Sequence, residues 1–321
     1  MLPLGSDEAA AGNCLRRMVE MIIEQAFHNL PEVLVGSGYA KQKYEAGIVT
    51  AFSLAILQEL NGRNIADPIG CLCAEMQYPD IPKKLRADLH VQLDRLHSGS
   101  RDYSEFGFRH SNWVEAKFFR GGGESKPSTQ NIVTVIADLL RLVVLVPIQT
   151  AKRQKELTIT GRYYLHAYYG PPLEHLNPKR KRKGAAQRAW IGKLLESGER
   201  TIDGFELDQE PDKSFDDLRN GLGSATCRIG LTNFVLQPTQ SRNTNYYTIV
   251  LSRIDSAEFS MNGESIVLKT DRTFERPSKE KLKDLRAGVA LAVKPKTVSK
   301  KKEQADEEED VDDQSADTTG A

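Results

Sequence analysis

Two short stretches decide the fold, and they read Arg86-Ala87-Asp88-Leu89-His90-Val91 and Asn112-Trp113-Val114-Glu115-Ala116-Lys117-Phe118-Phe119. Each is an apolar run that predicts a β-strand, and each carries an acid inside the run. Side chains alternate between the two faces of a strand. Glu115 and Lys117 are therefore expected on one face of the second strand, with its apolar residues on the other face.

Asp88, Glu115 and Lys117 are the residue types that cleave phosphodiester bonds with a metal ion. Carboxylates are the ligands that Mg²⁺ prefers, and the bound ion neutralises the phosphate and activates a water. The lysine would position or deprotonate that water, or offset charge on the phosphate. We therefore take Asp88 and Glu115 as candidate metal ligands and Lys117 as a candidate catalytic residue, with Mn²⁺ as a substitute for Mg²⁺. The structural alternative is an exposed Glu115–Lys117 ion pair, which would contribute little to stability.

The segments around these stretches predict an α/β fold, a mixed sheet with helices on both faces. Apolar residues at three-to-four spacing indicate helices, and apolar runs bounded by proline, glycine or polar residues indicate strands. The predicted elements up to residue 176 are, in chain order, helix 13–30, a glycine-containing loop at 35–39, helix 43–60, strands 69–78, 85–93 and 113–119, helix 131–145 and strand 161–169.

Asp88 and the triplet Glu115-Ala116-Lys117 resemble the signature of the PD-(D/E)xK nuclease superfamily, whose fold is called restriction-endonuclease-like. The order helix, three strands, helix, strand over residues 37–170 is similar to the core of that family. Two features depart from it: alanine stands where the proline of the signature would precede Asp88, and a long gap separates Asp88 from Glu115. The resemblance implies a type II restriction enzyme or a related phage-defence nuclease that cuts DNA.

The same resemblance implies a further acid, because many members carry one on the helix before the first strand. Glu45 is the candidate, since it lies on the apolar stripe of the helix predicted over 43–60. An acid in the first turn of a helix also complements the helix dipole, so a purely structural role is the alternative. Glu59, at the other end of that stripe, and Glu75, on the first strand, compete for the catalytic role.

The charges of the chain are unevenly distributed. The 321 residues include 44 Lys and Arg and 44 Asp and Glu, but the segment from Glu303 onward holds nine acids and no Lys or Arg. A basic body with an acidic tail fits a protein that meets a polyanion, although a tail of this kind also keeps a protein soluble. Five consecutive basic residues are candidate contacts to DNA phosphates, with a solvated loop or a nuclear localisation signal as alternatives. They are Lys179, Arg180, Lys181, Arg182 and Lys183.

Cysteine usage and hydropathy indicate a soluble cytoplasmic protein. The four cysteines show no paired spacing and are expected to be reduced thiols, which implies a reducing compartment. The longest apolar stretch, Ile132 to Val146, is interrupted by Asp138 and Arg141 and is too short to span a membrane. No zinc-ligand spacing occurs among the six histidines, and His90 and His166 are expected to be structural.

Three parts follow along the chain: a nuclease core at 1–176, a β-containing region at 177–293, and a disordered charged tail at 294–321. The middle part is predicted to hold two or three antiparallel strands within 225–273 and a helix at 279–293, and to contact DNA or to dimerise. A homodimer and a cognate methyltransferase or other defence-system protein are the expected partners.

The expected function is that of a Mg²⁺-dependent endonuclease. The main alternative is a non-catalytic, basic nucleic-acid-binding or scaffold protein with an acidic tail, in which Asp88, Glu115 and Lys117 would lie apart. A third hypothesis keeps the fold but changes the substrate, as in a junction resolvase or a transposition or repair nuclease.

Overall fold

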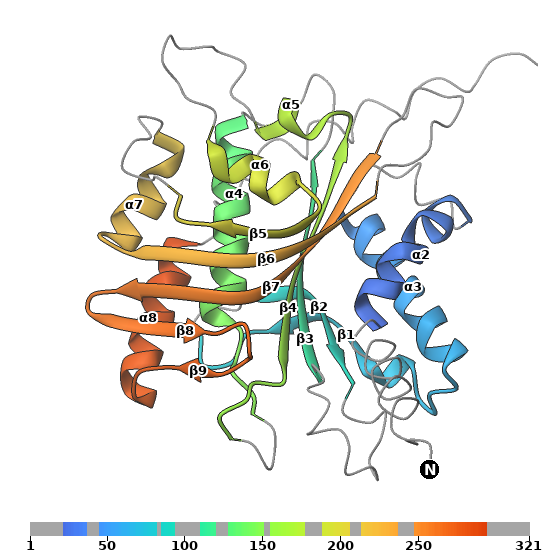
Figure 1. The fold of residues 1–321 in the computed structure, drawn as a ribbon, viewed down its shortest axis with the longest axis horizontal. Helices are drawn as coiled ribbons and strands as arrows, with labels where there is room; N and C mark the ends of the chain where they lie inside the picture. Colours follow the sequence, from blue (N-terminus) through green and yellow to red (C-terminus); the bar gives the residue numbers. More distant parts are fainter. Residues whose placement is uncertain are drawn as a thin grey trace, which may run out of the picture.

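A computed structural model of the protein describes residues 22–36, 45–81, 85–93, 110–119, 128–150, 155–176, 188–205, 213–236 and 247–293. In this part of the chain nine strands form one sheet, and helices lie on both of its faces (Figure 1). The prediction of an α/β protein with a mixed sheet flanked by helices is therefore confirmed. The basic run 179–183, the tail 294–321 and most of the long connection after Leu93 lie outside the described residues.

The first half of the sheet consists of the strands that the sequence predicts around the candidate site. They are β1 (Leu72–Gln77), β2 (Arg86–Gln92), β3 (Ser111–Phe119) and β4 (Thr160–Tyr169). β1, β2 and β3 pair antiparallel, whereas β3 and β4 are parallel. A parallel pair needs a crossover connection, and the helix α4 (Ser128–Leu140) supplies it.

The second half of the sheet continues from β4 without a break. Its strands are β5 (Gly198–Ile202), β6 (Thr226–Leu236), β7 (Tyr247–Met261), β8 (Glu264–Leu268) and β9 (Phe274–Glu275). The order is β1-β2-β3-β4-β7-β6-β5, with β8 paired to β7 and β9 to β8. The antiparallel pairing of β4 with β7 makes the strands after residue 177 part of the same sheet as the candidate site.

One face of the first half carries two helices, α2 (Ile22–Gly36) and α3 (Glu45–Gly62), which pack against each other and against the strands. Their buried side chains form a core with Leu89, Val114 and Leu165 from three neighbouring strands. The apolar stripe of α3 is buried as predicted, because its residues recur on the side that faces the sheet.

The opposite face carries a second core that runs under both halves of the sheet. This core includes α4, which continues as a π-helical segment over Arg141–Leu145 (Figure 1). Four other helices complete this layer in the described part of the chain: α5 (Pro172–Leu176), α6 (Ala189–Leu195), α7 (Asp216–Leu222) and α8 (Lys279–Ala292). None of the helices in the described part of the chain has the length and apolarity that a membrane crossing requires.

Several predicted boundaries are wrong, each for a local reason. The strand predicted over 69–78 starts only at Leu72, because residues 69–71 form a 3-10 turn in which the Gly70 N–H donates to Asp67 Oδ1 at 3.0 Å. The first helix continues past the predicted end at Leu30 to Gly36, with Pro31 inside it. Val33 and Leu34 are buried, so packing keeps this segment helical beyond the proline.

Candidate functional site

The pairing of β2 with β3 brings Asp88 next to Glu115. The antiparallel ladder between these strands ends at Leu89 and Val114, and the next residue of each strand is Asp88 and Glu115. Beyond that point the Ala116 N–H donates to Asp88 Oδ2 at 2.6 Å. A side-chain carboxylate thus satisfies a backbone amide that lies beyond the end of the ladder.

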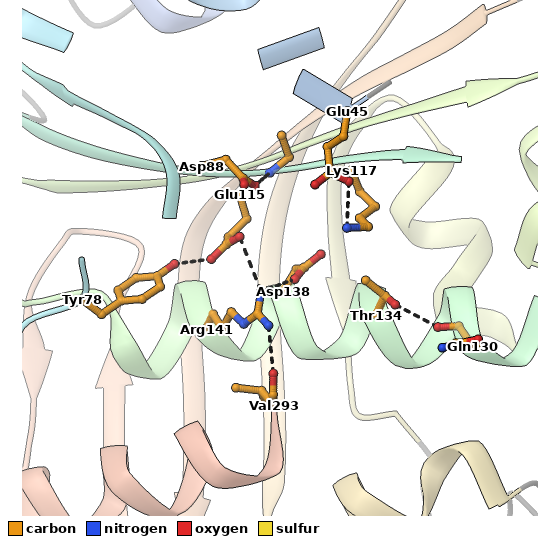
Figure 2. A network of polar contacts seen from close by, with 11 residues as sticks. Glu45, Tyr78, Asp88, Glu115, Lys117, Gln130, Thr134, Asp138, Arg141 and Val293 are labelled. Atoms are coloured by element: carbon orange, nitrogen blue, oxygen red, sulfur yellow. Dashed lines mark hydrogen bonds and ion pairs between the residues drawn. The ribbon is translucent and has the colours of Figure 1, made fainter. Parts of the chain in front are cut away.

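The alternation predicted for β3 is present in the structure. Val114, Ala116 and Phe118 belong to the core under α2 and α3. Glu115 and Lys117 lie on the other face, which is turned toward α4 (Figure 2). Apart from Lys117, which is half-buried, every residue of β3 is buried, so these charges are enclosed by protein on two sides.

Lys117 forms an ion pair with Glu45, the first residue of α3, with 2.7 Å between Nζ and Oε2. The two competing acids lie elsewhere. Glu59 pairs with Arg63 near the far end of α3, at 2.6 Å, and Glu75 is exposed on the edge strand β1. The structure therefore brings Glu45, and neither Glu59 nor Glu75, to the residues of β2 and β3.

Glu115 is only 2% exposed and is bound by two groups from other elements. The hydroxyl of Tyr78, a fully buried residue directly after β1, donates to Oε1 of Glu115. The guanidinium of Arg141 lies 3.8 Å from Oε2 of the same carboxylate. Figure 2 shows the Glu115 carboxylate directed toward these two groups.

Helix α4 and its π-helical extension contribute two charged residues that the sequence analysis did not assign to the site. Arg141 Nη1 donates to Asp138 Oδ1 at 2.9 Å, and Nη2 donates to the carbonyl oxygen of Val293 at 2.9 Å. π-helical turns are frequent at functional sites, and this one begins at Arg141 itself. The signal was present in the sequence, because both charges interrupt the apolar stretch 132–146.

The resulting cluster has more acids than bases: Glu45, Asp88, Glu115 and Asp138 surround Lys117 and Arg141 (Figure 2). Burial, together with the charges of Glu45 and Asp138, raises the pKa of Asp88 to about 7 although the Ala116 N–H opposes the shift. Burial also raises the pKa of Asp138, to about 6, and the pKa of Glu115. These carboxylates therefore repel one another in a site that is short of positive charge.

The pKa values of the two cations are also raised, which for a cation favours the charged form. Burial alone would lower the pKa of Lys117, but the charges of Asp138 and Glu45 outweigh it, so the pKa is raised. The pKa of Arg141 is raised in the same way by Asp138 and Glu115. Both side chains thus keep their protons at neutral pH.

The donor set suits a hard cation, but in the described part of the chain no three His, Cys, Asp or Glu side chains are arranged to hold a metal ion. Each acid of the cluster is engaged by a protein group: Lys117, the Ala116 N–H, Tyr78 or Arg141. Within this cluster the buried atoms Asp138 Oδ2 and Arg141 Nε have no hydrogen-bond partner among the described residues. Excess carboxylate charge and an unsatisfied buried oxygen both fit a group of residues that a divalent cation would stabilise.

His90 and His166 form hydrogen bonds with other residues of the sheet. His90 Nε2 lies 2.9 Å from the Ser111 hydroxyl, and the ring packs against Trp113. His166 is fully buried, contacts the hydroxyls of Tyr168 and Ser252, and has a pKa lowered to about 3 by burial. Both geometries are structural.

Three of the four cysteines lie in the described part, Cys71, Cys73 and Cys227, and all three are free thiols, as predicted.

Comparisons with known proteins return nothing for this chain: no family model, no curated protein and no solved structure matches it.

Proposed function

We propose that this chain is a Mg²⁺-dependent endonuclease that hydrolyses DNA phosphodiester bonds. The observation that carries the proposal is the convergence of Asp88, Glu115 and Lys117 from neighbouring strands on one enclosed site. A scaffold protein has no reason to gather a buried Glu115 and the partly buried Asp88 and Lys117 in one place, because removing charges from water costs free energy.

The arrangement of elements around the site supports a restriction-endonuclease-like core. The chain runs α3, β1, β2, β3, α4, β4, which is the order that the resemblance implies, and the acids lie on β2 and β3. Glu45 on the preceding helix, paired with Lys117, fits the further acid that many members of the PD-(D/E)xK superfamily carry.

Asp88 and Glu115 would hold Mg²⁺, with Mn²⁺ as a substitute. When bound, the ion neutralises the scissile phosphate and activates a water. Lys117, whose raised pKa keeps Nζ protonated, would act as a cation that orients the phosphate or the water. Since Lys117 is a poor base in this state, a carboxylate of the cluster is better suited to accept the proton of the water.

Within this class we propose a type II restriction-like or other phage-defence nuclease that acts on DNA, as a homodimer or with a defence-system partner. Burial of the site on two sides requires that DNA approach along the side where Lys117 and Glu45 remain partly exposed, at 27% and 36% of their side-chain surface. The basic run 179–183 is a candidate phosphate contact, and it lies outside the described residues.

The test is incubation of the purified protein with plasmid and phage DNA in Mg²⁺, in Mn²⁺ or in EDTA. The Lys117→Ala variant is compared with Lys269→Ala, which removes an exposed lysine that pairs with Glu275. Metal-dependent cleavage that is reduced at least about 100-fold in Lys117→Ala and kept in Lys269→Ala supports the proposal. DNA binding without cleavage in either metal would favour the non-catalytic nucleic-acid-binding protein instead, and a preference for branched DNA would favour a resolvase.

A further inference from the structure

Glu115 and Asp88 are neighbours across two strands, yet each carboxylate is bound by different groups. Asp88 accepts the Ala116 N–H, whereas Glu115 accepts the Tyr78 hydroxyl and faces Arg141. In Figure 2 Tyr78 and Lys117 lie on opposite sides of Glu115. The bond to Tyr78 therefore draws the Glu115 carboxylate away from the part of the site where Glu45 and Lys117 meet.

Tyr78 is a rigidly held donor. It is fully buried, its N–H donates to the Leu85 carbonyl oxygen at 3.1 Å, and its ring stacks on Trp113 with 5.3 Å between ring centroids. Trp113 is fixed in turn, because its indole N–H donates to the Ser111 hydroxyl at 3.2 Å and His90 packs on its ring. The phenol ring of Tyr78 therefore cannot follow Glu115 if the carboxylate moves.

Arg141 adds a cation to the same side of Glu115 and is itself anchored. It is held by Asp138 and by the carbonyl oxygen of Val293, directly after α8. Tyr78 and Arg141 together supply a hydrogen bond and a positive charge, which stabilise the charge of this carboxylate as a bound metal ion would.

We propose that Tyr78 is a positioning residue that limits the metal affinity of the site, because its hydroxyl competes with the cation for the Glu115 carboxylate. This inference rests on the proposed function in one respect, the role of Asp88 and Glu115 as metal ligands. An ion held beside Asp88 would require Glu115 to turn away from Tyr78, and the free energy of the broken hydrogen bond would be subtracted from the affinity. Tyr78 needs no contact with DNA in this role.

The decisive variant is Tyr78→Phe, which removes the hydroxyl and keeps the ring that stacks on Trp113. Mn²⁺ is titrated calorimetrically into the full-length protein, without DNA, at neutral pH. We expect Mn²⁺ to bind about 2- to 10-fold more tightly to the variant, the range that corresponds to the net free energy of one hydrogen bond. A gain in affinity cannot arise from damage to the fold, which separates this role from a structural one.

The matched control is Tyr163→Phe, which deletes the hydroxyl of another buried tyrosine that donates to a glutamate, Glu24, at 3.4 Å. That pair lies on the opposite face of the sheet, under α2. Its removal is expected to leave the Mn²⁺ affinity unchanged.

A second measurement uses the wild-type site and does not depend on the folding of Tyr78→Phe. The chain has two tryptophans, so Trp190→Phe leaves Trp113, which stacks on Tyr78, as the sole tryptophan, and excitation at its absorption edge avoids tyrosine emission. Release of Glu115 from Tyr78 is expected to change the emission of Trp113 as Mg²⁺ is added, with the same midpoint as calorimetry. An emission that stays constant while calorimetry detects binding would overturn the inference.

The outcomes separate this inference from the proposed function. Tighter binding of Mn²⁺ to Tyr78→Phe supports it, including the case in which the wild-type protein binds too weakly to measure. Equal or weaker binding to the variant overturns it and leaves the nuclease proposal to the cleavage assay. If neither protein binds Mn²⁺ or Mg²⁺ at millimolar concentration, both the inference and the metal-dependent mechanism are wrong.

Discussion

The two halves of the sheet enclose charge in different ways. β3 and β4 have helices on both faces, and nearly every residue in them is buried, including Glu115 and His166. β6 in the other half alternates between buried and partly exposed residues, because its inner face packs on the core and its outer face meets solvent. A charged residue is therefore solvated in one half of the sheet and removed from water in the other.

A charge that is exposed on the outer face of β6 is solvated, and its presence needs no explanation. Arg228 on β6 is such a case, since 65% of its side chain is exposed although it pairs with Asp203. A charge on β3 is removed from water and persists only if other groups compensate it or if function requires it. The acid excess around Glu115 leaves compensation incomplete, which is why this cluster is the candidate site.

The largest expected difference between the two halves is the loss of stability when one arginine of each is replaced. Arg141→Met leaves Asp138 and Glu115 buried without their cation, so we expect the free energy of unfolding to fall by about 3–5 kcal/mol. Arg228→Met on β6 is expected to change it by no more than about 0.5 kcal/mol. Urea denaturation of the two variants measures both values, and similar losses would contradict the distinction between the two halves.

A smaller effect, on activity rather than stability, is expected from neutralising one glutamate in each half. Glu115→Gln keeps the shape of the side chain and removes one of four crowded negative charges, so stability is expected to be kept or raised while cleavage falls at least about 100-fold. Glu258→Gln, on the exposed face of β7, should alter neither property. Cleavage rates under saturating Mg²⁺ and thermal unfolding of both variants provide the comparison. Full activity in Glu115→Gln would remove Glu115 from the site.

The smallest expected effect is a pH dependence of stability that originates in the first half. Burial raises the pKa of Asp88 to about 7, so between about pH 4 and pH 7 the folded protein holds a proton that the unfolded chain releases. Stability must therefore fall as the pH rises through this interval and level off above pH 7. Because Asp88 is partly exposed, we expect its share to be on the order of 2 kcal/mol.

Urea denaturation between pH 4 and pH 8, without metal, tests this dependence. Asp88→Asn should make the decline shallower than in the wild-type protein. Asp271→Asn, from the second half, is the control, because hydrogen bonds from Thr273 lower the pKa of Asp271 and place its titration below this interval. A wild-type slope that survives unchanged in Asp88→Asn would show that other groups cause it.

Local sequence patterns predicted most elements of the first half correctly. The two strands with acids, the helix over 43–60 and the strand over 161–169 follow from apolar periodicity, since each buries a continuous face. The strand β5 and the helices α5 and α7 were not predicted. They are short, and their apolar residues acquire a pattern only when placed against the core.

The residues of the candidate site also divide into those that the sequence identifies and those that only the tertiary structure identifies. Asp88, Glu115 and Lys117 could be selected from the sequence because each interrupts an apolar strand. Of the three competing glutamates only Glu45 pairs with Lys117, and no local pattern distinguishes it from Glu59, which lies on the same helix. That choice depends on how α3 crosses the sheet.

The sequence by itself determined which residues alternate on β3, and therefore that Glu115 and Lys117 share a face, because the two-residue period of a strand is a property of the backbone. Only the tertiary structure decided what those residues face. Asp138, Arg141 and Tyr78 come from a helix, its π-helical end and the residue after an edge strand, and Val293 lies 152 positions from the arginine it binds. Contacts between residues so far apart follow from the packing of whole elements, which no local pattern encodes.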